Sequence, residues 1–421
     1  MPTAAYYTLG CKVNQYETEK IRAEMEANGF ETVKFSDRSD IYIVNTCTVT
    51  SIADGKSRHV IRQAVVRNPR ALVIATGCYA ELEPQAIGVI DGVDIVVPNN
   101  EKDEIARRVL ARFPGMAPAR HLVNKAAPRM RTRAVLKVQD GCDLFCAYCT
   151  VPFARSVKQS RSLKNIISET RELAAFGYKE IVLTGIRLGS YCGGNGKDIA
   201  DIAQAVSCID GIARVRLSSI EVWEITDKLI SAMASNSKIC PHLHVPLQSG
   251  DDKILGAMGR PYDTGTYSKI VDHARREIPG IAITTDILVG FPGETDDSFE
   301  RGLAFVEDMG FSRLHVFRYS PRPMTKAAQL TDQIPNDVKE LRSKKMIELG
   351  ARMSQGFAAR HVGHSISVLA ENKTAEPGRL KGFTGSYVEV TFEAPRRYVG
   401  SIVDVDVVEA MDGKLIGKLG G

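Results

Sequence analysis

The chain has 421 residues, of which 44% are hydrophobic and 25% are charged, and its formal net charge is +5. This length suits about two to four domains, and the composition is typical of a soluble globular protein. It excludes a protein that spans a membrane, because no window approaches the roughly 18 consecutive apolar residues of a spanning helix. With no signal-peptide pattern at the start, we expect a cytoplasmic protein whose nine cysteines serve as thiols or metal ligands.

The first segment predicts an open α/β sheet. Strands are expected at Tyr6–Leu9, Asp40–Val44 and Ala71–Ala75, with helices at Glu17–Asn28 and Ile52–Val66. The pattern of strand, helix and strand is that of a parallel sheet covered by helices.

A cysteine stands just past the end of each of these strands, namely Cys11, Cys47 and Cys78, which we call the N-terminal cysteines. Because the carboxyl ends of parallel strands meet at one edge of a sheet, we expect the three thiols to converge there. Three converging thiolates favour a metal cluster. Separate burial of three unrelated cysteines is the alternative, since cysteine is often buried.

A basic, proline-containing linker follows. Between Arg107 and Lys164 the chain has 13 Lys or Arg and only two acidic residues. Pro114, Pro118 and Pro128 interrupt regular structure there and indicate a domain boundary. The local excess of positive charge favours a polyanionic partner, and a solvated linker is the alternative.

From residue 134 onward, six strand–helix units predict a parallel barrel or an open part of one. The expected strands are Ala134–Val138, Glu180–Leu183, Arg214–Ser218, His242–Leu247, Ile281–Leu288 and Arg313–Tyr319. The expected helices are Leu163–Phe176, Ile199–Ile209, Thr226–Ser235, Thr266–Glu277 and Asp297–Met309.

Three cysteines spaced C-x3-C-x2-C follow the first barrel strand, namely Cys142, Cys146 and Cys149, which we call the loop cysteines. Thiolates suit iron–sulfur clusters, and three of them leave one iron of a cubane without a protein ligand. Such an open position is typical of a site that does chemistry. A structural zinc site, or three buried free thiols, is the alternative.

Polar or glycine-rich turns follow the later strands, at the face where barrel active sites are built. They include Thr184-Gly185, Glu221, Gln248 and the stretch from Val289 to Glu294. Glycines in such turns let a small ligand approach the backbone closely. His242 and His244 alternate with apolar residues, and we expect packed or hydrogen-bonded histidines rather than metal ligands.

The last segment predicts a small β-barrel, with strands at His364–Ala370, Ser386–Phe392 and Ile402–Glu409. Its acidic and basic residues balance. Local clusters favour contact with single-stranded nucleic acid, because bases stack on aromatic rings that lie beside cations. Aromatic residues of the barrel core are the alternative. The residues of these clusters are Arg379, Lys381, Arg396 and Arg397 with Phe383, Tyr387 and Tyr398.

The chain resembles the radical S-adenosylmethionine (SAM) methylthiotransferases over nearly its whole length. The C-x3-C-x2-C loop is their radical SAM signature, and the segments TLGCKVNQYET, NTC and TGC match their auxiliary-cluster set. The segments TLGCKVNQYET and QDGCDLFCAYC are most similar to the branch that modifies N6-threonylcarbamoyladenosine beside the tRNA anticodon. The resemblance implies an N-terminal domain at 1–115, a linker at 116–133, a radical SAM core at 134–356 and a TRAM-like RNA-binding barrel at 357–421.

The resemblance also implies the cofactors. The loop cysteines would hold a [4Fe–4S] cluster that binds SAM and reduces it to a 5′-deoxyadenosyl radical. The N-terminal cysteines would hold a second [4Fe–4S] cluster that carries the sulfur. Two SAM molecules would be used, and the product would be the 2-methylthio derivative. Tyr148, Thr184, Gly185, Glu221 and Gln248 match SAM-contacting positions.

The implied partners are tRNA, a sulfur donor and an electron donor of the flavodoxin or ferredoxin type. Arg155, Lys158 and Arg161, just after the cysteine loop, join the four barrel cations as expected RNA contacts. The chain departs from the family pattern near the expected substrate entrance, which leaves the RNA contacts open there. The departures are Ser156, Gln159, Arg318 and Met324.

The sequence is also compatible with two alternative functions. The first keeps the chemistry but changes the substrate to an isopentenyladenosine tRNA or an aspartate of a ribosomal protein. The second is a metal-stabilised RNA-binding protein without catalysis.

Overall fold

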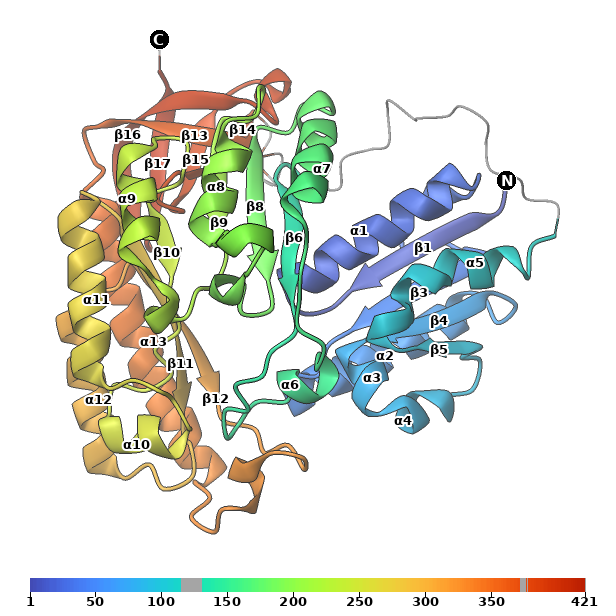
Figure 1. Ribbon diagram of the computed structural model, residues 1–421, viewed down its shortest axis with the longest axis horizontal. Helices are drawn as coiled ribbons and strands as arrows, with labels where there is room; N and C mark the ends of the chain where they lie inside the picture. The colour runs from blue at the N-terminus through green and yellow to red at the C-terminus, as the bar shows by residue number, and fades with distance from the viewer. Residues whose placement is uncertain (115–130, 372–375, 377, 421) are drawn as a thin grey trace.

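The computed structural model describes residues 1–114, 131–371, 376 and 378–420 (Figure 1). Most of the predicted basic linker therefore lies outside the described residues. An N-terminal sheet, a central partial barrel and a C-terminal closed barrel follow one another along the chain, as the mixed α/β prediction expected. No helix among the described residues is long and apolar enough to cross a membrane.

The N-terminal sheet has five parallel strands in the order β2-β1-β3-β4-β5. Every residue of β3 and β4 is buried, because helices cover both faces of the sheet. The three predicted strands are confirmed, whereas β2 and β5, of three residues each, were missed. The strands are β1 (Thr3–Thr8), β2 (Glu31–Val33), β3 (Ile41–Thr46), β4 (Leu72–Gly77) and β5 (Ile95–Val97), and the helices are α1 (Lys12–Ala27), α2 (Ser51–Arg67), α3 (Cys78–Leu82), α4 (Pro84–Gly88) and α5 (Ile105–Leu110).

This strand order creates a switch point between β1 and β3. The chain leaves β1 toward β2 on one side and then returns to place β3 on the other side. Open α/β sheets bind ligands outside the carboxyl ends of the strands at such a point. Cys11 follows β1 and Cys47 follows β3, so two N-terminal cysteines flank the position where the fold leaves room for a ligand.

The central domain is an open barrel of six parallel strands, as predicted. Two sheets, β7-β6-β8-β9 and β10-β11-β12, are joined by single bridges from Val215 to Ile239 and from Ser219 to His244. The strands are β6 (Ala134–Asp140), β8 (Glu180–Gly185), β9 (Arg214–Leu217), β10 (His242–His244), β11 (Ala282–Val289) and β12 (Arg313–Arg318), with a short antiparallel β7 (Gln159–Ser160).

Helices cover the outside of this barrel (Figure 1). All five predicted helices are present, and the long helix α13, which packs on β12, was not predicted. The helix α1 of the N-terminal domain lies against β6, so the two domains meet at the open side of the barrel. The helices are α7 (Leu163–Ala175), α8 (Ile199–Ser207), α9 (Asp227–Ser235), α11 (Thr264–Glu277), α12 (Asp296–Met309) and α13 (Asn336–Ala359).

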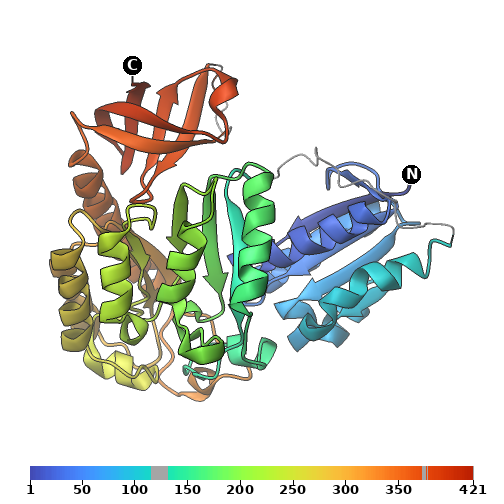
Figure 2. The same cartoon turned by 45° about the horizontal axis from the view of Figure 1, so that its top comes forward.

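The C-terminal domain is a closed five-stranded barrel in the order β13-β14-β15-β17-β16, and Figure 2 shows it at one end of the central domain. The predicted small β-barrel is confirmed, although β14 and β17 were missed. The strands are β13 (Ser365–Glu371), β14 (Arg379–Thr384), β15 (Glu389–Glu393), β16 (Ile402–Met411) and β17 (Lys414–Leu419).

Two arginines of β9 fasten the C-terminal barrel to the central one. Arg214 donates to the carbonyl oxygens of Phe383 and Ser367 at 2.9 and 2.7 Å, and Arg216 donates to that of Gly385 at 2.8 Å. The fully buried carboxylate of Glu180 accepts from Nε of Arg216 at 2.7 Å.

We expect Glu180→Gln to lower the free energy of unfolding by about 3–5 kcal/mol, because it leaves buried arginine charge without its carboxylate. Chemical denaturation followed by circular dichroism measures this. The matched control is Glu389→Gln, which removes a partly exposed pair with Lys381 and should cost about 1 kcal/mol or less. Equal losses in the two variants would contradict the assignment of Glu180 to the joint between the barrels.

Candidate functional site

The N-terminal cysteines gather at the carboxyl edge of the first sheet. Cys11 directly precedes α1, Cys47 follows β3, and Cys78 begins α3. All three are free thiols. The pKa of the Cys47 thiol is raised to about 11, mainly by burial, and the charges of Cys78 and Cys11 contribute to this rise. Because β1, β3 and β4 are adjacent and parallel, the three cysteines lie at one edge of the sheet, and a cluster held by them stays a prediction.

Two glycines let the chain turn at these cysteines. Gly10 has φ +91°, and a Cβ there would lie 2.8 Å from Sγ of Cys47. Gly77 has φ +99°, and its Cβ would lie 2.4 Å from the carbonyl oxygen of Thr46. Each position needs glycine for both conformation and space. Gly10 therefore lets the chain before Cys11 pass close to the Cys47 thiol, and Gly77 lets the chain before Cys78 pack against the end of β3.

The loop cysteines lie between β6 and a short helix, α6 (Val151–Ala154). The Cys142 N–H donates to the carbonyl oxygen of Arg155 at 3.1 Å, and the Cys149 N–H donates to that of Cys146 at 2.9 Å. Ala147 forms two backbone hydrogen bonds. Its N–H donates to the Met258 carbonyl at 2.8 Å, and its carbonyl accepts from the Ala327 N–H at 2.8 Å. The loop is therefore fixed from several elements at once.

The spacing of the sulfurs suits a cluster better than a single ion. Zinc bound at about 2.3 Å would hold any two sulfurs within about 4.6 Å of each other. Among the described residues, only His244, Asp286 and His315 bring three such donor atoms within 4.8 Å of one another. Neither cysteine trio brings all three of its sulfurs within that distance, and three thiolates that each bind their own iron are the donor set of a cubane cluster. The donor sets thus fit [4Fe–4S] clusters.

Arg155 joins the two cysteine sites, and its predicted contact with RNA is corrected. It is buried, and its guanidinium donates to Glu17 at 2.8 and 2.9 Å, to Asn14 at 2.9 Å and to Asp140 at 3.0 Å. Glu17 and Asn14 belong to α1, whereas Asp140 ends β6. The guanidinium is therefore enclosed between α1 and β6, where it is buried rather than exposed to a substrate.

Arg260 is a residue that the sequence pattern did not reveal. Its guanidinium is buried, lies 3.4 Å from Sγ of Cys146 and forms an ion pair with Glu221. It also stacks over Trp223 and Tyr262, about 5 Å from each ring centre. Glu221, expected to contact SAM, is thus engaged by an arginine that puts positive charge beside a cluster thiol. No spacing rule in the sequence connects Arg260 with Cys146.

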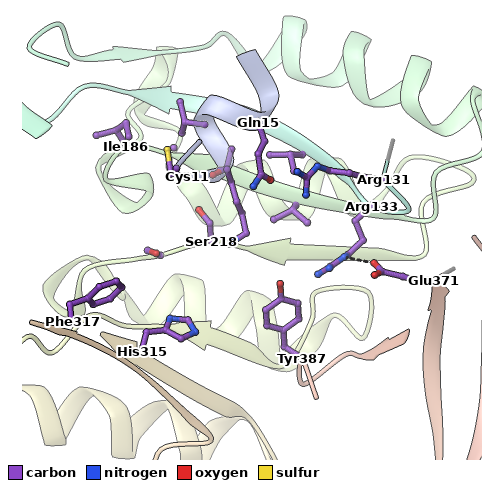
Figure 3. Close-up of a pocket in the computed structure, with 18 residues that line it drawn as sticks. Cys11, Gln15, Arg131, Arg133, Ile186, Ser218, His315, Phe317, Glu371 and Tyr387 are labelled. Carbon is purple, nitrogen blue, oxygen red and sulfur yellow. Dashed lines mark hydrogen bonds and ion pairs between the residues drawn. The ribbon is translucent and has the colours of Figure 1, made fainter. Parts of the chain in front are cut away.

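A cavity of about 530 Å³ lies where the three domains meet (Figure 3). Its lining includes Cys11 from the N-terminal domain, Thr184 and Gly185 from the end of β8, and Tyr387 from the C-terminal barrel. Gly185 is required there, since its Cβ would lie 2.7 Å from Cβ of Gln139. The cavity therefore brings one N-terminal cysteine together with the turn predicted to meet SAM.

The other three expected SAM residues lie outside the lining of this cavity. Tyr148 packs with a small apolar cluster that includes Met258 and Phe291. Gln248 adopts φ +69°, and its N–H donates to the Asp286 carbonyl at 2.8 Å. Glu221 pairs with Arg260, as described above. Their roles toward SAM stay predictions.

The remaining cations of the predicted RNA surface differ in exposure. Lys158 is exposed and pairs with Asp143 at 2.8 Å, and Arg161 is half-buried and pairs with Glu169 at 2.6 Å. In the C-terminal barrel, Arg379 and Lys381 pair with neighbouring glutamates. Arg396 and Arg397 are exposed.

Two of the aromatic rings expected to stack on bases are covered. Arg133 stacks over Phe383 and Tyr387 at 4.7 and 5.1 Å from the ring centres. Both rings are half-buried and neither belongs to the apolar core of the C-terminal barrel. The third ring, Tyr398, has the guanidinium of Arg397 over it, 5.2 Å from the ring centre.

Comparison with known proteins agrees with this architecture. Residues 3–98 match the model described as Uncharacterized protein family UPF0004, and residues 136–306 match the Radical SAM superfamily. The radical SAM methyltransferase TsrM from Kitasatospora setae has the same kind of fold, with a TM-score of 0.57 over 78% of this chain and 75% of that one at 16% identity.

The curated relatives extend the match to the whole chain. The threonylcarbamoyladenosine tRNA methylthiotransferase MtaB of Bacillus subtilis is 37% identical over 97% of this chain and 94% of its own length. The MtaB of Thermotoga maritima is 38% identical over 94% of this chain and 92% of its own length. A tRNA-2-methylthio-N(6)-dimethylallyladenosine synthase of Staphylococcus haemolyticus is 31% identical over 97% of this chain and 83% of its own length. This chain therefore belongs to the radical SAM methylthiotransferase family, whose radical SAM domain implies SAM and a [4Fe–4S] cluster.

Proposed function

We propose that this chain is a tRNA methylthiotransferase that converts N6-threonylcarbamoyladenosine beside the anticodon to its 2-methylthio derivative. The observation that carries the proposal is the shared cavity, where Cys11 meets the Thr184–Gly185 turn. Sulfur held at one and SAM bound at the other would both reach a base placed between them. Relatives with this activity in their names, aligned over nearly the full length, support the same substrate.

The two cofactor sites have separate tasks in this proposal. The loop cysteines would hold a [4Fe–4S] cluster, which would supply the electron for cleavage of SAM, and the N-terminal cysteines would hold a second cluster, which would carry the sulfur to be transferred. The chain orients both. Arg260 fixes Glu221 and puts a cation beside Cys146, and Arg155 fastens α1, which follows Cys11, to the end of β6.

The proposal needs partners that match its chemistry. These are tRNA, an electron donor of the flavodoxin or ferredoxin type, and a sulfur donor. We place the reaction in the cytoplasm, where thiols stay reduced. Lys158, Arg161, Arg379, Lys381, Arg396 and Arg397 remain the proposed RNA contacts, with exposed Arg396 and Arg397 the best placed to reach phosphates.

Nucleoside mass spectrometry of tRNA tests the substrate. We expect cells without this chain to lose 2-methylthio-N6-threonylcarbamoyladenosine and to accumulate the unmethylthiolated parent, and we expect the intact gene to restore the product. The matched control is the gene carrying Cys142→Ala, which should restore nothing. Loss of the 2-methylthio form of dimethylallyladenosine, with the threonylcarbamoyl product unchanged, would instead establish the substrate named for the Staphylococcus relative.

A further inference from the structure

The large cavity has a charged lining with one cation of particular interest. Three cations and one carboxylate contribute to it. Arg133 pairs with that carboxylate, Glu371, at 3.0 Å, and both lie at the end away from Cys11 in Figure 3. Arg131 is exposed. The third cation, Lys12, is half-buried and forms no ion pair or hydrogen bond with any residue in the described ranges.

The carboxylates near Lys12 already pair with other side chains. It also lines a smaller hollow of about 70 Å³ together with His244, Thr284 and His315. The nearest acid to that group, Asp286, lies 3.2 Å from each of His244 and His315 and bonds to both. Lys12 is thus an ammonium group that faces an interior cavity without a protein counter-ion.

The position of Lys12 relative to the chemistry limits what it can bind. Lys12 directly follows Cys11 in the sequence. In adenine, C2 and N6 lie on the same edge of the ring, separated only by N1 and C6. A base whose C2 faces sulfur carried by the cluster that Cys11 would help to hold must therefore place its N6 substituent in the same cavity.

We propose that Lys12 binds the carboxylate of the N6-threonylcarbamoyl group and so selects an acidic N6 substituent over an uncharged one. The inference rests on the proposed function, because it takes the substituent from that substrate. An unpaired ammonium in a partly desolvated cavity favours a carboxylate and disfavours a hydrocarbon chain of similar size. Lys12 is a specificity residue in this account, separate from the cluster ligands.

Binding measurements with the cluster-loaded enzyme test the inference. The probes are two anticodon stem-loops, one with threonylcarbamoyladenosine and one with the same group as its primary amide. We expect Lys12→Met to weaken binding of the carboxylate stem-loop about 10- to 100-fold, as for loss of a hydrogen bond to a charged group, and to leave the amide stem-loop unchanged. Lys12→Arg should keep the preference for the carboxylate.

The control variant is Lys20→Met, which removes a charge from the same helix. Lys20 is exposed and pairs with Asp103, so both stem-loops should bind this variant as they bind the wild type. Equal weakening of both stem-loops by Lys12→Met, or no weakening of either, would overturn the role of Lys12. A wild-type enzyme that binds the carboxylate form selectively but never methylthiolates it would overturn the proposed function and leave this inference standing.

Discussion

Replacing all three N-terminal cysteines with alanine should abolish methylthiolation of tRNA while 5′-deoxyadenosine still forms from SAM. The reason is that the two trios are held by different parts of the fold. The N-terminal cysteines sit at the edge of the first sheet, whereas the loop cysteines are fixed by backbone bonds to Arg155 and Met258 in the central domain. Loss of one trio leaves the other supported.

Three measurements on the anaerobically reconstituted enzyme decide the matter. Iron should fall from about eight to about four atoms per chain, 5′-deoxyadenosine should stay within a few-fold of the wild-type amount, and the methylthio product should disappear. The matched control replaces the loop cysteines with alanine, which should halve the iron equally but abolish SAM cleavage as well. Loss of SAM cleavage in both variants would show that the roles are not separate.

The cysteine positions could be predicted because local pattern carries them. A run of β-branched residues that ends in Asn-Thr-Cys or Thr-Gly-Cys identifies both a strand and what stands at its end. Parallel pairing then puts the ends on one edge without further information. The strand order, with its switch point between β1 and β3, was not needed to predict convergence, but it explains why the space beside Cys11 and Cys47 is open.

The side chains around the cysteines could not be predicted, because they come from distant parts of the chain. Arg155 follows a basic run that favours contact with RNA, but in the fold it meets Glu17, 138 residues away. Arg260 reaches Cys146 across 114 residues. Local charge describes what a segment would attract in water. It does not say which buried acid from another domain will neutralise it.

The same limit explains the strands that were missed. The strands β2 and β5 have three residues each, too few to show a period. The strand β14 contains Arg379 and Lys381 beside Gly382, and its charges read as a binding patch rather than as the outward face of a barrel strand. In each case the strand forms because it pairs with neighbouring strands, and the sequence does not show that pairing.

The Arg155→Met variant should separate SAM cleavage from methylthio transfer and also destabilise the protein. Burial raises the pKa of Glu17, but Lys102 and Arg155 outweigh this and hold the pKa well below its usual value. Removal of the guanidinium leaves Glu17 with Lys102 and Lys137 as its remaining cations and breaks the buried bonds to Asn14 and Asp140. We expect a loss of up to about 3–5 kcal/mol in the free energy of unfolding. Because α1 would lose its link to β6, more 5′-deoxyadenosine should form per methylthio group transferred.

The Arg155→Met variant should be more sensitive to acid than the wild type. A carboxyl group whose pKa is lowered by folding stabilises the fold above its unfolded pKa, and that stability is lost as the pH falls through the folded value. In Arg155→Met the pKa of Glu17 should rise toward its usual value, because Arg155 is one of the cations that lower it, so acid unfolding should begin at a higher pH than in the wild type. Circular dichroism against pH measures this shift.

Arg352→Met provides the control, because Arg352 also pairs with a carboxylate, that of Glu307, but between α13 and α12 and away from both cysteine sites. Its pair is exposed, and its removal should cost about 1 kcal/mol or less and leave acid unfolding where it is in the wild type. If both variants lose the same stability and both keep the wild-type ratio of 5′-deoxyadenosine to product, Arg155 does not join the two cysteine sites. If only Arg155→Met changes that ratio, the salt-bridge network between α1 and β6 positions the sulfur-bearing site against the site that cleaves SAM.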